Sequence, residues 1–312
     1  MTAAPPALNS IISRLSLKQL RLLIALDERG SLQSAARQVA LTQPGASKAL
    51  GEIETTFGTQ LFQRTNRGLD ATPVGRCVIR YARLICTDVA HLREELVSVM
   101  SGSGGRAAVG VIMGAVPLVT EAISVVIAQH HDMSVEIVED TSATLLALID
   151  QGRLDMAICR TSVSQFPNQY ESVNIRQEKL AVIASNEHPL AGRRHLSLHQ
   201  LAEYRWVVYR ANMPMRLLLE REFREAGLPF PINLLETTSA LATLSLLQNN
   251  SSFVALASVD VAQFCTRYGL TRILPVDLNS VSEPYELVLR HGIVPSPAAA
   301  LLIAQLTDRT SC

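Results

Sequence analysis

The sequence carries no surplus of charge of either sign, because 28 Lys and Arg residues balance 28 Asp and Glu residues in 312 positions. The charge of the whole chain therefore does not indicate a nucleic-acid or membrane partner. Its five cysteines form no CxxC pair and are too scattered for a disulfide framework, which favours a reducing compartment. The N-terminal stretch MTAAPPALNS lacks the basic start and the apolar core of a signal peptide. We expect a cytoplasmic protein.

Long apolar runs are also scarce. The stretch 107–128 is long enough to cross a membrane and contains one charged residue, Glu121. Gly114 and Pro117 divide it into a strand-like half and a helix-like half, and the same alternation continues after it. We therefore interpret the stretch as a buried strand followed by a helix, and we expect no membrane partner.

Sequence motifs of common enzymes are missing as well. The chain has no HExxH, no GxSxG and no P-loop, and His130 and His131 are adjacent, which on a helix turns them about 100° apart. The stretch SGSGG, Ser101–Gly105, follows a helical pattern and precedes a strand pattern, the reverse of the order in a dinucleotide-binding turn. We expect no catalytic residue, no cofactor and no metal site, and we keep an α/β enzyme as the least favoured alternative.

Charge is distributed unevenly along the chain. Residues 1–85 contain eleven Lys or Arg against five Asp or Glu, and the remainder contains 17 against 23. A basic N-terminal part is thus followed by an acidic body, and the basic part is where a nucleic-acid partner is to be sought.

Three short helices are predicted in the basic part. Apolar residues recur at helical spacing from Leu17 to Arg29, and Gly30 ends that segment. Ser31 is placed to cap a second helix, and Thr42 to cap a third that carries a proline in its first turn. Two short helices joined by a tight turn are what a helix-turn-helix requires.

The third helix has two unlike faces. Ala46, Leu50, Ile53 and Phe57 fall on one face, at steps of four, three and four. The opposite stripe, which begins with Gln43 and Ser47 beside Pro44 and Lys48, has no carboxylate in its first half, so it can approach an anion. A solvated face is the ordinary alternative, but the preceding helix and turn favour a DNA-reading helix.

A small hairpin and a long helix complete the N-terminal third. Asn66, Arg67 and Gly68 form a turn pattern, and Thr72 with Pro73 opens a helix. The apolar positions of this helix step by fours, threes and sevens, which predicts pairing with a second copy of the chain. They are Val74, Val78, Tyr81, Ile85, Leu92 and Val99.

Beyond the flexible SGSGG linker, strand and helix patterns alternate to the end of the chain, with strand patterns at Leu180–Ser185 and Tyr285–Arg290 among them. This order predicts parallel or mixed sheets covered by helices, an α/β body. About 200 residues exceed one typical sheet unit, so we expect two lobes.

Several motifs occur together in the N-terminal third. They are AAR (35–37), TQPGASKAL (42–50), IE (53–54), LFQR (61–64) and TPVG (72–75). In order and spacing, residues 17–72 resemble the winged helix-turn-helix of LysR-type transcriptional regulators. The stretch RLSLKQLRLLIALDERGSL is similar to the galactose-binding-protein regulator branch of that family.

The resemblance implies a sequence-specific, DNA-binding transcriptional regulator with three parts. These are a winged helix-turn-helix at 15–72 with its motif at 31–50, a dimerisation helix at 73–101, and an effector-binding domain at 107–312 that resembles a periplasmic binding protein. Its lobe 1 is expected at about 107–172 and 284–308, and lobe 2 at about 173–283. The implied DNA-binding residues are Arg37, Thr42, Gln43, Pro44, Ser47, Lys48, Arg64 and Arg67.

By the same resemblance a small-molecule effector lies between the lobes, where strands end and helices begin. Hydroxyls and amides at helix N-termini favour an anion there, and plain helix capping is the equal alternative. The candidate contacts are Gly114, Ala115, Thr141, Ser142, Arg160, Arg210, Thr237 and Thr238. Operator DNA, a second or fourth copy of the chain, and RNA polymerase at the promoter are the other implied partners.

Two further alternatives stay open from the sequence. Some LysR-type proteins switch through a cysteine pair, and Cys159 and Cys265 are the candidates here, although their surroundings are apolar. A DNA-bending protein without effector control would leave two thirds of the chain without a role.

Overall fold

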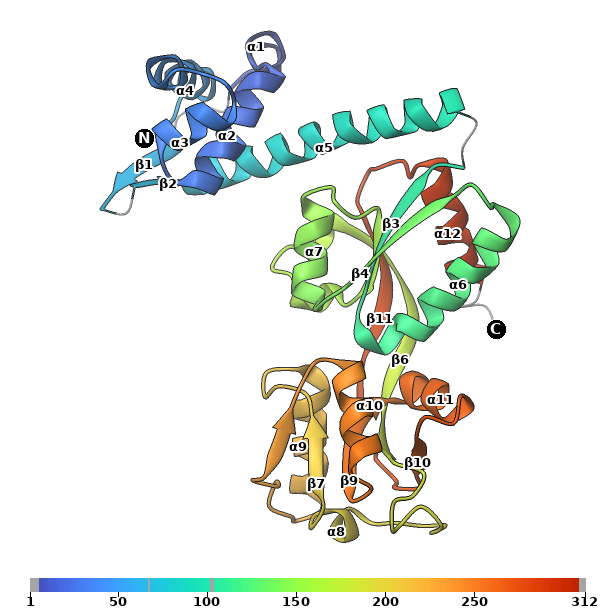
Figure 1. Ribbon diagram of the computed structural model, residues 1–312. Helices are drawn as coiled ribbons and strands as arrows, with labels where there is room; N and C mark the ends of the chain where they lie inside the picture. Colours follow the sequence, from blue (N-terminus) through green and yellow to red (C-terminus); the bar gives the residue numbers. More distant parts are fainter. Residues whose placement is uncertain (1–5, 67, 102–103, 309–312) are drawn as a thin grey trace. The chain divides into compact units, whose positions relative to one another are not determined.

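The computed structural model describes residues 6–66, 68–101 and 104–308, which form two compact units. We call residues up to 101 the head and residues from 104 onward the body, and each is described by itself (Figure 1). The predicted fold class is confirmed: a winged helix-turn-helix, a long helix and an α/β body follow one another along the chain.

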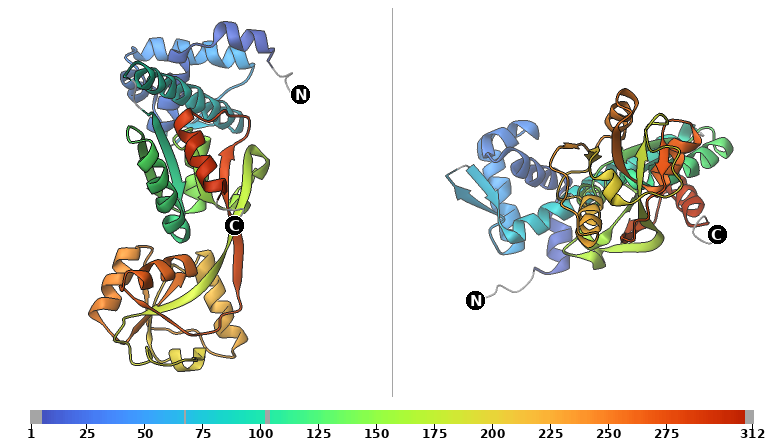
Figure 2. Two further views of the ribbon diagram at one scale, coloured as in Figure 1. Left: turned by 90° about the vertical axis from the view of Figure 1, so that its right-hand side faces the viewer. Right: turned by 90° about the horizontal axis from the view of Figure 1, so that it is seen from below.

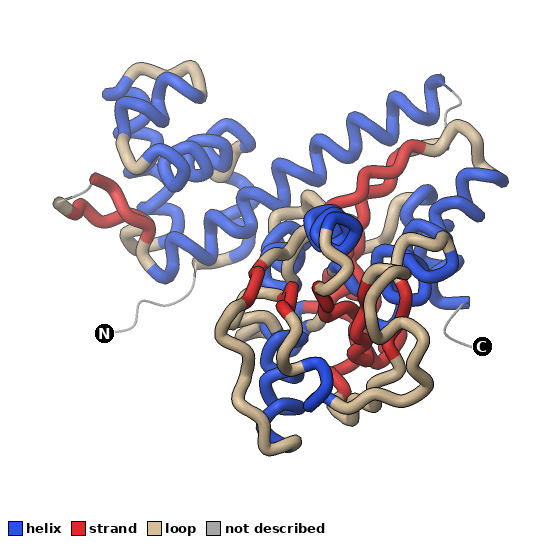
Figure 3. The backbone as a smooth tube through the Cα atoms, turned by 60° about the horizontal axis from the view of Figure 1, so that its bottom comes forward, coloured by secondary structure: helices blue, strands red, loops and turns tan. Residues whose placement is uncertain are grey.

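The head is helical except for one hairpin (Figure 3). Its elements are α1 (Leu8–Arg14), α2 (Leu17–Arg29), α3 (Leu32–Gln38), α4 (Gln43–Phe57), β1 (Phe62–Thr65), β2 (Gly68–Ala71) and α5 (Pro73–Ser101). Side chains cap the three predicted helices: Ser16 and Gln19 form a capping box on α2, Ser31 accepts from the Ser34 amide, and Thr42 accepts from the Gly45 amide. Helix α1 was not predicted.

The head core fixes the orientation of α4. Leu22, Leu26 and Ala35 are fully buried against Ile53 of α4, so the apolar faces of α2, α3 and α4 share one cluster. The hairpin is attached to α4 through Glu54, whose Oε1 accepts from the amides of Leu61 at 2.8 Å and Phe62 at 3.2 Å. Burial of the inner face and this carboxylate together leave the opposite face of α4 outward.

Helix α5 starts in direct contact with the hairpin. A Cβ on Gly75 would overlap the carbonyl of Leu61, so only glycine permits this approach. The Thr72 side chain accepts from the Gly75 amide at 3.0 Å, which caps the first turn of α5. The TPVG motif therefore fixes the position at which the long helix begins beside the hairpin.

The body alternates strands and helices, as the sequence predicts. Its strands are β3 (Arg106–Val111), β4 (Ser134–Glu139), β5 (Met156–Cys159), β6 (Tyr170–Ala184), β7 (Arg205–Val208), β8 (Leu234–Glu236), β9 (Phe253–Ser258), β10 (Arg272–Leu274) and β11 (Val281–Arg290). Its helices are α6 (Val116–Gln129), α7 (Ser142–Asp150), α8 (Leu198–Leu201), α9 (Pro214–Glu225), α10 (Ala240–Asn249), α11 (Val259–Arg267) and α12 (Pro297–Asp308), with short 3-10 turns η1 (Met113–Ala115), η2 (Thr161–Val163) and η3 (Pro167–Gln169).

Two long strands join two lobes. The strand order is β4-β3-β5-β11-β6-β9-β7-β8, with β10 beside β6. Strands β3, β4 and β5 are parallel and form lobe 1, whereas β7, β8 and β9 are parallel and form lobe 2. Strands β6 and β11 pair antiparallel and pass from one lobe to the other (Figure 2). Two register shifts in this pair, between Val281 and Pro284 and between Tyr285 and Glu286, lie at the crossing.

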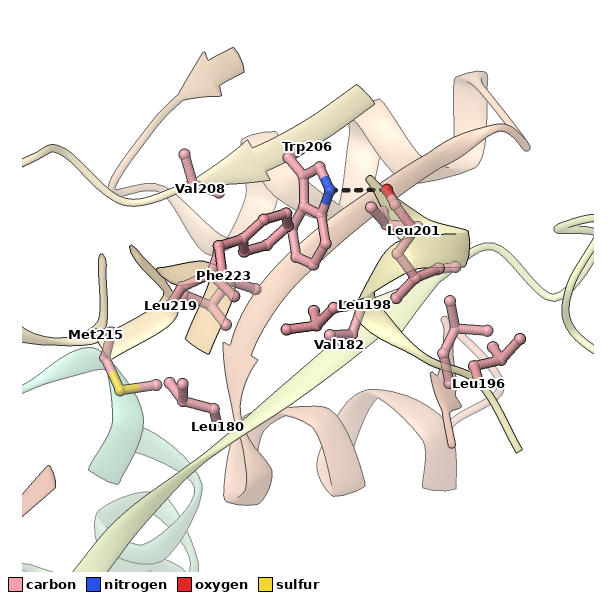
Figure 4. Close-up of a cluster of buried hydrophobic side chains, with 14 of the residues drawn as sticks. Leu180, Val182, Leu196, Leu198, Leu201, Trp206, Val208, Met215, Leu219 and Phe223 are labelled. Atoms are coloured by element: carbon pink, nitrogen blue, oxygen red, sulfur yellow. Dashed lines mark hydrogen bonds between the residues drawn. The ribbon is translucent and has the colours of Figure 1, made fainter. Parts of the chain in front are cut away.

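The core of lobe 2 centres on the single tryptophan (Figure 4). Trp206 is fully buried, and its ring meets Phe223 edge-on with centroids 5.5 Å apart. Its indole Nε1 donates to the Leu201 carbonyl at 3.0 Å, so the one polar atom of the ring is satisfied. This core holds β7 in place next to β9, which pairs with the crossing strand β6.

Candidate functional site

The outer face of α4 is exposed over its first half. Thr42, Gln43, Pro44, Ser47 and Lys48 are all exposed, while Ala46 on the inner face is fully buried. Thr42 has a second task, because its hydroxyl caps the helix at the Gly45 amide at 3.2 Å. Lys48 lies 4.0 Å from Glu52, and both side chains are largely exposed, so this pair leaves the ammonium free to reach an anion.

The remaining predicted DNA contacts lie on two other elements of the head. Arg37 on α3 and Arg64 on β1 are both exposed. Arg67 lies outside the described residues. Gly51 on α4 has open space where a side chain would be, so no other described segment covers the helix there. Basic side chains on α3, α4 and the hairpin thus flank one uncovered helix face.

Helix α5 carries an apolar stripe that the rest of the head leaves exposed. Tyr81, Ile85 and Leu92 are 52%, 40% and 56% exposed, and Val74 is exposed as well. Val78 differs, because it packs against the head core. The sequence reading missed Leu96, which is 53% exposed one turn beyond Leu92. Steps of three and four place this stripe on one side of the helix.

In the body, strand ends from the two lobes meet. The Tyr209 hydroxyl, directly after β7, lies 3.3 Å from the Met113 sulfur, which follows β3. Gly114 faces Glu178 of β6 so closely that a Cβ on Gly114 would overlap the carboxylate. The same Cβ would lie 3.4 Å from the Ser258 hydroxyl at the end of β9. In open α/β sheets, ligands bind at the carboxyl ends of parallel strands.

Arg160 and Glu178 form a buried ion pair at this meeting point. Arg160 is 7% exposed and Glu178 4% exposed, and Nη2 of the arginine donates to Oε2 of the glutamate. Arg160 also donates to Ser282 Oγ at 3.0 Å and to the Glu283 carbonyl at 3.2 Å, both on β11. The predicted site residue Arg160 is therefore engaged by both crossing strands rather than open to solvent.

The other predicted effector contacts are spread around this pair. Ser142 accepts from the Arg160 amide at 3.2 Å, which brings these two predicted residues together. Ala115 is fully buried, whereas Arg210 is exposed. Thr141, Thr237 and Thr238 lie on the loops before α7 and α10, where Thr141 Oγ1 accepts from the Thr144 amide at 3.4 Å and Thr237 Oγ1 from the Ser239 amide at 3.0 Å.

Glu178 and Tyr209 were missed by the sequence reading. Burial, followed by the negative charges of Glu178 and Glu139, raises the pKa of Tyr209, so its phenol stays protonated. A charged residue two positions before the apolar run Leu180–Ala184 was the available signal for Glu178. The signal is weak, because most surface strands also carry such a residue.

The cysteines do not form a reactive pair. Cys159 and Cys265 are buried, and burial, then the charge of Glu286, raises the pKa of Cys159 to about 12. Burial also raises the pKa of Cys265. A thiolate is the reactive form, so these environments disfavour a redox switch.

The described residues contain no cluster of three His, Cys, Asp or Glu side chains placed to bind a metal ion. Within the same residues, no helix is long and apolar enough to span a membrane.

Two family models match the chain. One, described as bacterial regulatory helix-turn-helix protein, lysR family, matches residues 17–76, and the other, described as LysR substrate binding domain, matches residues 101–311. The chain is a LysR-type transcriptional regulator. This regulator is 31% identical over 303 residues to the HTH-type transcriptional regulator GbpR of Azospirillum brasilense, covering 96% of the chain and 88% of that protein.

A second relative and two solved structures agree with this family. The LysR-type regulator is 28% identical over 288 residues to GalR of Pseudomonas putida, covering 92% of the chain and 72% of that protein. The crystal structure of CbnR, a LysR family transcriptional regulator, matches with a TM-score of 0.63 at 17% identity over 95% of this chain and 99% of that one. CbnR in complex with its target DNA matches equally, with a TM-score of 0.63 at 18% identity over 95% and 100%.

These matches decide between the predicted alternatives. The LysR-type regulator binds DNA through its helix-turn-helix and has an effector-binding domain, and its relatives are transcriptional regulators rather than enzymes. The names GbpR and GalR agree with the branch predicted from the sequence. The redox alternative is not favoured, because both buried thiols are kept protonated.

Proposed function

We propose that this regulator reads its operator with the outer face of α4 and that a small molecule bound between the lobes of the body alters this binding. One observation carries the proposal: residues 42–48 of the α4 segment present an exposed face without a carboxylate, opposite a fully buried inner face. In a helix-turn-helix, the first residues of the second helix reach base edges in the major groove.

Each side chain on this face has a proposed role. Gln43 pairs with an adenine edge, because its amide offers a donor and an acceptor together. Ser47 and Lys48 donate to bases or phosphates, and Thr42 and Pro44 shape the start of the helix. Arg37 contacts the DNA backbone. Arg64 and Arg67 on the hairpin follow phosphates or enter the adjacent minor groove.

The apolar stripe of α5 supports assembly into a dimer, or a tetramer built from dimers. Val74, Tyr81, Ile85 and Leu92 are exposed large hydrophobic residues on one helix side, and a paired α5 would bury them. Val78 packs against the head core and so holds the first turns of the helix that carries the stripe. Two heads held in this way would read half-sites one or more helical turns apart. RNA polymerase at the promoter is the further proposed partner, in the cytoplasm.

An effector site between the lobes is supported by the convergence of strand ends around Glu178. Gly114 and Arg160 lie against that carboxylate, and Ser142 accepts from the Arg160 amide. Other predicted contacts lie on loops of the two lobes: Thr141, Arg210, Thr237 and Thr238. Ala115 would act through packing alone. A ligand there would favour one arrangement of β6 and β11 over another, and only this difference in affinity can shift DNA binding.

Selection of operator sequences from random DNA by the full-length protein tests the proposal. Wild-type protein is expected to enrich one motif with two half-sites, and Gln43→Ala to lose preference at one base of each half-site. The exposed residue Lys179 in the body provides a control, because Lys179→Ala should enrich the wild-type motif. An unchanged motif for Gln43→Ala would refute the assignment of α4.

A further inference from the structure

Glu178 is the charged side chain around which both lobes meet. It belongs to β6, the strand shared by the lobes, and is 4% exposed. Gly114 after β3 and Arg160 after β5 approach it from lobe 1. Its charge also raises the pKa of Tyr209, which follows β7 in lobe 2. Any ligand placed at these strand ends therefore meets the field of Glu178.

The two oxygens of this carboxylate have different surroundings. Oε2 accepts from Arg160, while Oε1 lies beside Gly114 and accepts no hydrogen bond from any described residue. Oε1 is an acceptor that no described donor occupies, so it can receive a donor from a bound molecule. Arg160, by contrast, has its guanidinium committed to Glu178, Ser282 and the Glu283 carbonyl.

Three of the helix N-termini around the site are capped by their own side chains. The Ser239 hydroxyl accepts from the Ala242 amide at 3.2 Å at the start of α10, and the Ser258 hydroxyl accepts from the Val261 amide at 3.4 Å at the start of α11. Thr141 does the same for α7. These side chains occupy amides that would otherwise bind a carboxylate.

Two other charged groups near the site do not favour an anion. Arg176 is paired with Asp260, with Nη1 and Oδ1 2.6 Å apart. Partial burial raises the pKa of the Glu139 carboxyl at the end of β4, although much of this residue is exposed. A bound carboxylate would add a further negative charge beside Glu178 and would have to compete for Arg160.

We infer that the effector site takes a ligand without negative charge that donates a hydrogen bond, through a hydroxyl or an ammonium group, to Oε1 of Glu178. The inference rests on the proposed function, because it names the ligand class of the proposed effector site. Glu178 is then the specificity-determining residue, and it acts twice: it accepts from the ligand, and it neutralises the arginine that a carboxylate would need.

Replacement of one carboxylate oxygen of Glu178 by an amide nitrogen tests this inference in the full-length protein. Glu178→Gln keeps the shape of the side chain but removes the negative charge that neutralises Arg160. Titration with acetate, followed by NMR shifts and thermal stability, should give a saturable site at least about tenfold tighter in Glu178→Gln than in wild type. Equal acetate binding in the two proteins, or none in either, would overturn the inference.

A second glutamate provides the matched control. Glu283→Gln removes the same charge next to the site, but Arg160 contacts the main-chain carbonyl of residue 283 and stays paired with Glu178. This variant should resemble wild type. If it gained acetate binding as Glu178→Gln does, the effect would come from net charge alone and the assignment to Glu178 would be wrong.

Wild-type protein decides the question if Glu178→Gln does not fold. It is titrated with acetate, methylammonium and ethylene glycol at equal ionic strength, and one or both of the donors should saturate while acetate does not. The two donors distinguish an ammonium ligand from a hydroxyl ligand. Saturation by acetate, or by none of the three, contradicts the inference.

Failure of the inference and failure of the proposed function give different results. A carboxylate that binds wild type and changes operator binding would overturn the ligand class and leave the regulatory function intact. A donor that binds beside Glu178 without changing operator binding would support the ligand class and contradict effector control.

Discussion

Arg83 of α5 donates from Nη1 to the Glu28 carboxylate of α2 at 2.9 Å, and its Nη2 reaches Asp27 at 3.0 Å. Glu28 in turn accepts from Gln38 of α3, so the contacts of one guanidinium extend from the long helix through α2 to α3, the helix before α4. The long helix is thus attached to the helix-turn-helix by a fork of charge-assisted bonds.

Removal of these hydrogen bonds should loosen the attachment of α5 to α2. Arg83→Ala is expected to lower the free energy of unfolding by about 1 kcal/mol, because the groups are partly exposed. The hydrogen bond from Arg83, then that from Gln38, lowers the pKa of Glu28 below 4.5. The stabilisation is therefore present at neutral pH and disappears as the pH falls through the lowered pKa. Urea unfolding at pH 7 and pH 3.5 measures it, and an equal loss for the variant at both pH values would contradict the assignment.

Ala40, in the turn between α3 and α4, has a left-handed backbone with φ of 53°. A residue with a Cβ pays about 1 kcal/mol in that conformation, whereas glycine does not. Ala40→Gly is therefore expected to raise the free energy of unfolding by up to about 1 kcal/mol in thermal or urea melts. Ala36→Gly in the helix before it is the control and should lower stability. A destabilised Ala40→Gly protein would show that the turn gains something else from the methyl group.

Lys48 and Gln43 should affect DNA binding in different ways. Lys48→Ala is expected to weaken binding to operator and scrambled DNA alike and to reduce the slope of log K against log salt by about one. Gln43→Ala should weaken operator binding by about 1–3 kcal/mol and leave binding to scrambled DNA unchanged. Fluorescence anisotropy between 50 and 200 mM salt separates the two effects. A Lys48→Ala protein with the wild-type salt slope would place that side chain away from phosphate.

Oligomeric state should depend on the apolar stripe of α5. Leu92→Glu places a charge on the exposed stripe and is expected to shift the protein toward the monomer in sedimentation experiments, with loss of operator binding. Ala90→Glu adds the same charge at an exposed position about 160° around the helix from Leu92 and should leave the assembly intact. Dissociation by both variants, or by neither, would argue against pairing through this stripe.

Thiol reactivity should follow burial. Cys77 is exposed and is expected to react with a thiol reagent at pH 8, whereas Cys159 and Cys265 should react only after unfolding, because burial raises the pKa of both thiols. The double variant Cys159→Ser, Cys265→Ser should regulate as wild type does. Rapid labelling of Cys159 in the native protein would reopen the redox alternative.

Much of the structure of the head could be predicted from the sequence. Caps at Ser31 and Thr42, the proline in the first turn of α4 and the apolar spacing of Ala46 and Ile53 are local signals, so the helices and the outward face of α4 could be predicted. Helix α1 was missed because it has no buried residue and no side-chain cap. Val78 was placed on the stripe of α5, but the start of α5 packs on the head, which a heptad pattern does not report.

The structure of the body could be predicted less completely from the sequence. The sequence reading predicted a strand at Leu180–Ser185, but β6 begins at Tyr170, because its first half is exposed on most positions and lacks an apolar pattern. It likewise placed the start of β11 at Tyr285 rather than Val281. Both errors fall where the strands cross between lobes and alternation is interrupted by register shifts.

The sequence by itself determined the helix-turn-helix, the family and the exposed face of α4, because periodicity, caps and turns act over a few neighbouring positions. Only the tertiary structure decided the state of Arg160. Its partners Glu178 and Ser282 lie 18 and 122 positions away and meet it through strand pairing, so no local pattern could show that its charge is already neutralised. Electrostatics in a buried site depends on which charges the fold brings within contact distance.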